Sequence, residues 1–222
     1  MSVAQLTNIL QSHPQIQQSL SFAQLSLFFH LTNHLQLWLS RCVAPSHPDP
    51  PQKLPPDITA FLYGALELNV VEKPTLVAEC WTAFRQMIWS QESDLESQCS
   101  SWKLLNIFQD HGFEGGIGFQ DLYPPTRACL NSTCNLNVQP RPLTKSLSNK
   151  AVLYTRNFGP VPIWSHSAAC ICCSTRYYPN YYVHNDTCTY YDTMPTTIQA
   201  ATHAYVETSL CESFETSTVC AW

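Results

Sequence analysis

Two closely spaced pairs of cysteines constrain this chain more than any other feature of its sequence. Cys129 and Cys134 are separated by four residues, and Cys170 and Cys173 by two. Each pair lies beside residues that favour turns, and four thiolates from two tight turns satisfy the tetrahedral coordination of Zn²⁺. Such a metal has no open position for water or substrate, so it stabilises the fold and performs no chemistry. We therefore predict one structural zinc site formed by these four cysteines.

Other interpretations of the cysteines stay open. They could be buried thiols or disulfides, which is the usual state of isolated cysteines. Cys172 adjoins Cys173 and could replace it as a ligand. A second metal site could form from another group of candidate ligands, namely His184, Cys188, His203 and Cys211. A lone histidine near a tyrosine-rich strand is, however, more often a core or surface residue.

The composition predicts a folded chain with little attraction to polyanions. With 222 residues, of which 45% are hydrophobic, the chain can form one domain or two small ones. Only 12% of its residues are charged, and the formal net charge is -5. Neutralisation of phosphates normally dominates affinity for nucleic acid, so the electrostatic attraction to DNA is weak. The basic residues of the C-terminal half are Arg127, Arg141, Lys145, Lys150, Arg156 and Arg176.

The N-terminal sequence predicts neither export nor membrane insertion. Arg41 is the first basic residue, whereas a secretory signal has positive charge before its apolar stretch. The most apolar window, Leu20 to Leu39, contains too many polar side chains to cross a bilayer. We expect an intracellular, reducing environment, in which the cysteines are free or metal-bound. A secreted, disulfide-bonded protein is the alternative, and only then would the sequons at 131–133 and 185–187 have meaning.

Residues 1–120 show the apolar periodicity of α-helices. A stripe from Ile16 to Trp38 predicts one long amphipathic helix. Further stripes predict helices at 58–66, 76–88 and 102–109. Cys80 lies on the apolar stripe of the third helix and is expected in the core.

Proline and glycine divide the chain. Six prolines between residues 45 and 56 cannot continue a helix, so we predict an extended loop there, followed by Asp57 as an N-cap. A glycine-rich stretch at 113–118 marks the expected boundary between a helical region, residues 1–120, and a second region, residues 121–222. It lacks the pattern of a phosphate-binding loop.

The second region contains short runs of β-branched and aromatic residues. They predict strands at 152–155, 161–165, 176–183 and 189–191, followed by a short helix near 210–214. The predicted fold class is therefore α+β, a helical N-terminal half followed by a small strand-rich, zinc-ribbon-like module. The tyrosine run at 177–182 could stack on unpaired bases, but we favour a structural strand because few basic residues accompany it.

Catalytic motifs are not evident in the sequence. It has no GxSxG or HExxH pattern, nor the pattern of zinc deaminases. Cys170 with His166 could form a nucleophile and base, but this cysteine is better used as a metal ligand. We predict that the protein is not an enzyme and has no small-molecule substrate.

The order of motifs in the C-terminal half resembles that of a known family. Residues 123–127, YPPTR, precede the first cysteine pair, and residues 159–162, GPVP, lie between the pairs. The second pair is followed by STRYYPNYYVH at 174–184. Over roughly residues 122–215 these blocks resemble the cysteine-cluster domain of the fifth CxC-like class, which accompanies KDZ transposases in fungi.

This resemblance implies an accessory zinc-chelating module of a transposable element. The ligands that it implies are Cys129, Cys134, Cys170 and Cys173, and the implied partner is DNA or a transposase protein, in the nucleus. The carboxylate–metal nuclease core of a transposase is lacking, so we expect an accessory or truncated product. The alternative is a zinc-stapled protein-interaction domain without nucleic-acid contact.

Overall fold

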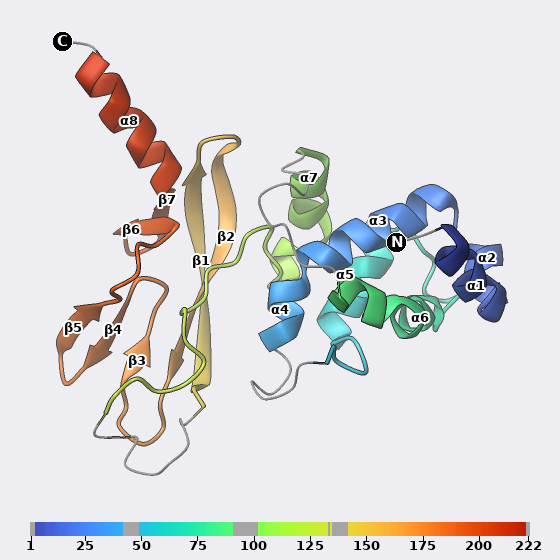
Figure 1. Cartoon of the computed structure of the whole chain (residues 1–222), viewed down its shortest axis with the longest axis horizontal. Coiled ribbons are helices and arrows are strands. Elements are labelled where there is room, and N and C mark those ends of the chain that lie inside the picture. The colour runs from blue at the N-terminus through green and yellow to red at the C-terminus, as the bar shows by residue number, and fades with distance from the viewer. Residues whose placement is uncertain (1–2, 42–48, 91–101, 133, 135–141, 221–222) are drawn as a thin grey trace. The chain divides into compact units, whose positions relative to one another are not determined.

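The computed structural model describes residues 3–41, 49–90, 102–132, 134 and 142–220 (Figure 1). Cys42, Cys99 and Arg141, part of the proline-rich loop and part of the first sequon lie outside these residues. The chain divides into two compact units, Met1–Gly115 and Gly116–Trp222. The first is helical and the second contains the sheet, which confirms the α+β class.

Within the described residues, no helix combines the length and the apolarity needed to cross a membrane.

The N-terminal unit consists of helices. Their bounds are α1 Val3–Ser12, α2 Pro14–Ser19, α3 Phe22–His34, α4 Gln36–Arg41, α5 Pro56–Ala65, α6 Leu76–Ser90, α7 Trp102–His111 and the 3-10 helix η1 Phe113–Gly115. The helices predicted at 58–66, 76–88 and 102–109 are confirmed as α5, α6 and α7. Cys80 is buried in the core, as expected.

The prediction of a single helix from Ile16 to Trp38 is wrong, because α2, α3 and α4 divide that stretch. Leu20 has an extended backbone and ends α2. Ser21 then starts α3 with a capping box: its hydroxyl accepts the Gln24 N–H, and the Gln24 side chain accepts the Ser21 N–H. The apolar stripe thus continues across a break in the backbone.

The predicted cap of α5 is also wrong. The helix begins at Pro56, with Pro55 at the N-cap and no side-chain cap. Proline is favoured at the first helical position because its missing N–H needs no partner there. Asp57 lies in the first turn, where its negative charge complements the helix dipole.

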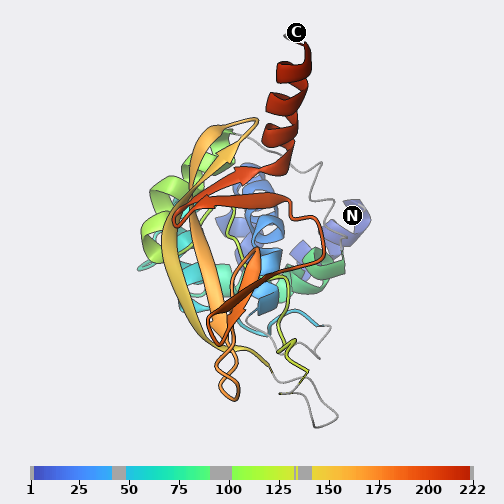
Figure 2. The same ribbon diagram turned by 90° about the vertical axis from the view of Figure 1, so that its left-hand side faces the viewer.

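The C-terminal unit contains one curled sheet followed by a helix. Its elements are β1 Thr144–Thr155, β2 Gly159–Ala169, β3 Arg176–Tyr177, β4 Tyr181–His184, β5 Thr187–Tyr190, β6 Thr197–Ala201, β7 Ala204–Glu207 and α8 Thr208–Cys220. The strand order is β5-β4-β3-β2-β1-β7-β6; among these strands β1 and β7 pair in parallel, and each other neighbouring pair is antiparallel. Figure 2 shows β1 and β2 side by side as a long curved hairpin, and in Figure 1 α8 projects away from the sheet.

The strand predicted over 176–183 is instead two strands joined by a turn. The Tyr178 N–H donates to the Tyr181 carbonyl oxygen (2.8 Å), which closes the turn around Pro179. Proline cannot donate to a strand ladder, which favours a turn at this position. The predictions of strands near 152–155, 161–165 and 189–191 correspond to β1, β2 and β5, whereas β6 and β7 were not predicted.

Asn180, in the β3–β4 turn, closes the curl of the sheet. Its buried amide donates to the Thr197 carbonyl oxygen (2.7 Å) and accepts the Gln199 N–H (2.8 Å). The Asn180 side chain thus forms hydrogen bonds with backbone groups of β6, the strand at the end of the sheet. On the other side of the core, the Tyr205 and Ser165 hydroxyls are hydrogen-bonded at 2.7 Å. The enclosed face carries the alternating buried residues of β1 and β2.

Candidate metal centre

The four predicted cysteines come from two turns of the C-terminal unit. Cys129 and Cys134 precede β1, and Cys170 and Cys173 lie between β2 and β3. All four Sγ atoms lie within 4.8 Å of one another, and the Cys129–Cys173 and Cys134–Cys170 separations are both 3.6 Å. A tetrahedral site with metal–sulfur bonds of about 2.3 Å has sulfur atoms about 3.8 Å apart. The cluster therefore fits a tetrahedral metal ion and is too open for a disulfide, whose sulfurs are about 2.05 Å apart.

The β2–β3 turn presents two of the sulfurs through its backbone. The Cys170 N–H donates to the Thr175 carbonyl oxygen (2.9 Å), and the Ser174 N–H donates to the Cys170 carbonyl oxygen (3.0 Å). Ser174 has a φ of 58°, a left-handed conformation that a residue other than glycine adopts only where its surroundings fix it. In this tight turn the N–H groups of Cys172 and Cys173 donate to the Cys170 sulfur.

Tyr177, on β3, contacts the turn that carries Cys129 and Cys134. Its hydroxyl accepts the Leu130 N–H (2.8 Å) and lies 3.3 Å from the Cys129 sulfur. The Asn131 N–H also donates to this sulfur. Cys129, Cys170 and Tyr177 form a buried core that further aromatic and aliphatic side chains cover. This role of Tyr177 leaves no signal in the sequence, although the alternation of the tyrosine run predicts that some of its members face the core.

The comparisons with known proteins bear on this unit alone. Residues 117–222 match the family model described as "CxC5 like cysteine cluster associated with KDZ transposases". The C-terminal unit carries a CxC5-like cysteine cluster. This confirms the family resemblance, and the matched segment includes all four cysteines. The chain gave no match among curated proteins or solved structures.

The four thiols of the CxC5-like cluster differ in acidity. Burial acts to raise the pKa of Cys173, but hydrogen bonds from the Thr175 hydroxyl and N–H outweigh it and lower the pKa to about 6. Burial is likewise outweighed at Cys170, whose pKa is lowered by the N–H groups of the turn. Burial raises the pKa of Cys129, and burial with neighbouring thiols raises that of Cys134 to about 12. At neutral pH the metal-free cluster therefore holds Cys173 as a thiolate, whereas Cys129 and Cys134 keep their protons.

Metal binding by the CxC5-like cluster is expected to release at least two protons at neutral pH. The Cys129 and Cys134 thiols must lose their protons before their sulfurs bind a metal. Affinity should therefore rise by at least about 100-fold per pH unit between about pH 6.5 and 8.5, and fall as the pH is lowered. Competition with a chelator across this range measures the slope. A pH-independent affinity would show that these two thiols are already ionised in the metal-free protein.

The structure separates the other candidate ligands from the cluster. Cys172 is exposed, and Cys173 rather than Cys172 belongs to the group of four. Throughout the described residues, no second group of three or more candidate ligands comes as close together. The suggested second site is therefore not formed: both nitrogens of the His184 ring have hydrogen-bonding partners, and Cys188 is exposed on β5.

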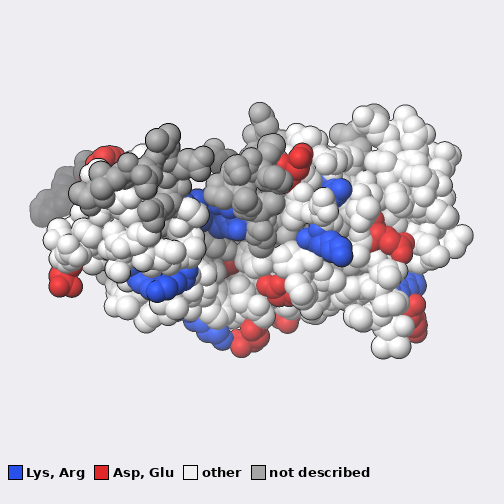
Figure 3. All heavy atoms as spheres, turned by 90° about the horizontal axis from the view of Figure 1, so that it is seen from below, with Lys and Arg blue, Asp and Glu red and all other residues white. Residues whose placement is uncertain are grey.

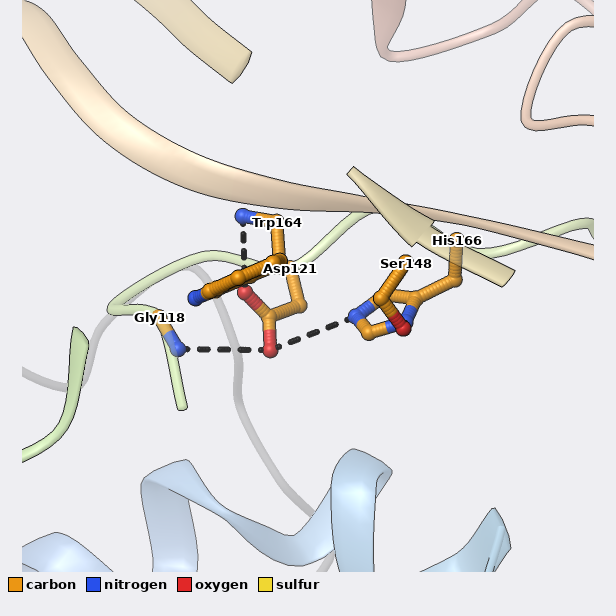
Figure 4. Close-up of polar contacts among 5 residues, drawn as sticks. All are labelled: Gly118, Asp121, Ser148, Trp164 and His166. Carbon is orange, nitrogen blue, oxygen red and sulfur yellow. Dashed lines mark hydrogen bonds and ion pairs between the residues drawn. The ribbon is translucent and has the colours of Figure 1, made fainter. Parts of the chain in front are cut away.

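His166, the suggested base for Cys170, belongs to a different cluster (Figure 4). Its Nδ1 is 2.9 Å from the Ser148 hydroxyl, and its Nε2 is 3.6 Å from an Asp121 carboxylate oxygen. The Tyr123 ring stacks on the imidazole, with centroids 4.2 Å apart. The serine, histidine and aspartate types are those of a catalytic triad, but 3.6 Å is too long for a hydrogen bond between Asp121 and His166.

The Asp121 carboxylate has a structural role in this cluster. It accepts the backbone N–H groups of Gly118 (3.3 Å) and Trp164 (3.2 Å) (Figure 4). Leu122 continues the attachment through a β-bridge to Ser165. A Cβ at Gly118 would come within 2.2 Å of the Asp121 side chain, so only glycine fits there without displacement. We interpret the cluster as an anchor that attaches the start of the unit to β2.

Proposed function

We propose that the C-terminal unit is a non-enzymatic module, stabilised by one structural Zn²⁺, that accompanies a KDZ-type transposase. The observation that carries this proposal is the group of four cysteines, spaced for tetrahedral coordination, within a segment that matches the KDZ-associated family. Zinc is favoured because four thiolates in a tetrahedron are its usual structural ligand set. Each of two turns supplies two cysteines, which is the ligand arrangement of zinc ribbons.

Metal analysis of the purified chain tests the zinc proposal directly. We expect about one zinc ion per chain, retained during dialysis against a metal-free buffer and removed by a strong chelator. Protein that has all four of these thiols reactive, and that folds equally well with and without metal, would contradict it.

We further propose that this module contacts DNA in the nucleus as an accessory to transposition. The association of the family with transposases supports this proposal. The surface predicts a modest affinity: on the face drawn in Figure 3, lysine and arginine side chains form small separate patches, several of them beside acidic residues. Because phosphate neutralisation dominates such binding, the interaction should be sensitive to salt.

A zinc-stapled protein-interaction domain without DNA contact is the second candidate. It is favoured by the scattered charge and by large apolar side chains that remain exposed in the C-terminal unit. Ile171 is 62% exposed, Tyr190 70% and Met194 84%. Exposed apolar side chains of this size are typical of surfaces that bind other proteins when they lie close together.

A salt titration of DNA binding by the zinc-loaded chain separates the two candidates. Contact with DNA predicts measurable binding at low salt. The logarithm of the binding constant should then fall linearly with the logarithm of the salt concentration. Replacing Lys145 and Lys150 by glutamine should reduce that slope by about 1 for each lost phosphate contact, whereas Lys53→Gln in the helical unit is the matched control. Failure to bind at low salt would favour the protein-interaction candidate.

A further inference from the structure

A chain of three hydrogen bonds extends outward from one sulfur of the metal centre. The Thr175 hydroxyl is 3.0 Å from the Cys173 sulfur and 2.9 Å from Nδ1 of His184. Nε2 of His184 is 3.3 Å from the side-chain nitrogen of Asn131. Thr175 is fully buried, and His184 lies at the end of β4.

One arrangement of protons satisfies all three bonds. A thiolate only accepts, so the Thr175 hydroxyl must donate to Cys173. The threonine oxygen then accepts a proton from Nδ1 of His184. This leaves a lone pair on Nε2, which accepts an N–H from the Asn131 amide. His184 is therefore a neutral imidazole with its proton on Nδ1, and neither ring nitrogen remains available to a metal.

The chain of bonds connects the two turns that supply the ligands. Asn131 lies between Cys129 and Cys134, and its backbone N–H donates to the Cys129 sulfur. At the other end, the N–H and the hydroxyl of Thr175 both donate hydrogen bonds to the Cys173 sulfur. A connection of this kind fixes the spacing of the two turns around the position of the metal.

We propose that Asn131, His184 and Thr175 form an outer-shell clasp that positions the two cysteine turns and sets the affinity of the centre for metal. His184 is thus a positioning residue and not a ligand. The proposal rests on the proposed function only in that a metal ion occupies the four-cysteine site. Outer-shell partners of metal ligands typically change metal affinity by about 10- to 100-fold.

Three substitutions in the full chain test the clasp, with Co²⁺ and Zn²⁺ as the metals. His184→Leu removes both hydrogen bonds of the ring and should weaken metal binding about 10- to 100-fold. His184→Asn retains a donor close to the position of Nδ1 and should recover most of the loss. Thr175→Val keeps the shape of the side chain but removes the hydroxyl, so it should weaken binding at least as much as His184→Leu.

The absorption spectrum of the Co²⁺-loaded protein distinguishes positioning from ligation. The spectrum should show four-thiolate coordination in the wild type and remain unchanged in His184→Leu, despite the weaker binding. A spectrum with a nitrogen ligand that disappears in His184→Leu would overturn the proposal, as would wild-type affinity in both His184→Leu and Thr175→Val.

NMR of the His184 ring nitrogens tests the clasp without any variant. We expect a neutral ring protonated at Nδ1, and a proton on Nε2 alone would overturn the proposal. This measurement also separates the clasp from the proposed function. If the wild-type chain binds no metal, the proposed function fails, while the protonation of His184 still decides whether the clasp exists. If a variant does not fold, NMR of the wild-type protein still tests the clasp.

Discussion

Cys173→Ser is expected to abolish metal binding and to unfold the C-terminal unit. A serine hydroxyl is a poor zinc ligand, so the loss of the Cys173 thiolate leaves three sulfurs around an incomplete site. Binding of a structural zinc contributes about 10–16 kcal/mol, which is as large as the whole net stability of about 5–15 kcal/mol typical of a domain. Metal analysis and NMR signals from β1 and β2 measure the effect. Cys134→Ser, in the other turn, should behave in the same way.

Cys172→Ser is the matched control for this prediction. Cys172 is adjacent to Cys173, but it is exposed and does not belong to the group of four. Its replacement should leave both the metal content and the fold unchanged. The reverse result, loss of metal in Cys172→Ser and retention in Cys173→Ser, would show that the ligand set is wrong.

The grouping of the four cysteines could be predicted because the short spacing within each pair largely determines it. Two residues between Cys170 and Cys173, and four between Cys129 and Cys134, restrict each pair to a single turn. The partners of the sulfurs were less accessible to sequence reasoning. Tyr177 and His184 reach the centre through the β3–β4 pairing, and hydrogen bonds set by strand register leave no pattern in the sequence.

The errors in the fold have a similar origin. The break at Leu20 was hidden because the apolar stripe continues across it, although Ser21 and Gln24 carry the signature of a capping box. β6 and β7 contain few strongly apolar residues, so their alternation is weak. The parallel pairing of β7 with β1 brings Val152 opposite Ala204, and such distant pairing is set by tertiary packing.

Phe84→Ala is expected to destabilise the helical unit by about 3–5 kcal/mol through the cavity that it leaves. Phe84, on α6, is completely buried, and its ring contacts that of Phe29 edge-on, with centroids 5.0 Å apart. Denaturant unfolding of the wild type and the variant measures the loss. Phe22→Ala is the control, because Phe22 is 80% exposed and its removal should change stability by no more than about 0.5 kcal/mol.

The same variant tests whether the metal centre depends on the helical unit. Phe84 belongs to the unit Met1–Gly115, whereas all four cysteines of the centre belong to Gly116–Trp222. Each unit has its own buried core, so Phe84→Ala should leave metal content and affinity at their wild-type values while the helices lose stability. A parallel loss of metal would show that the cysteine cluster folds only with the helical unit, and the module that binds metal would then be the whole chain.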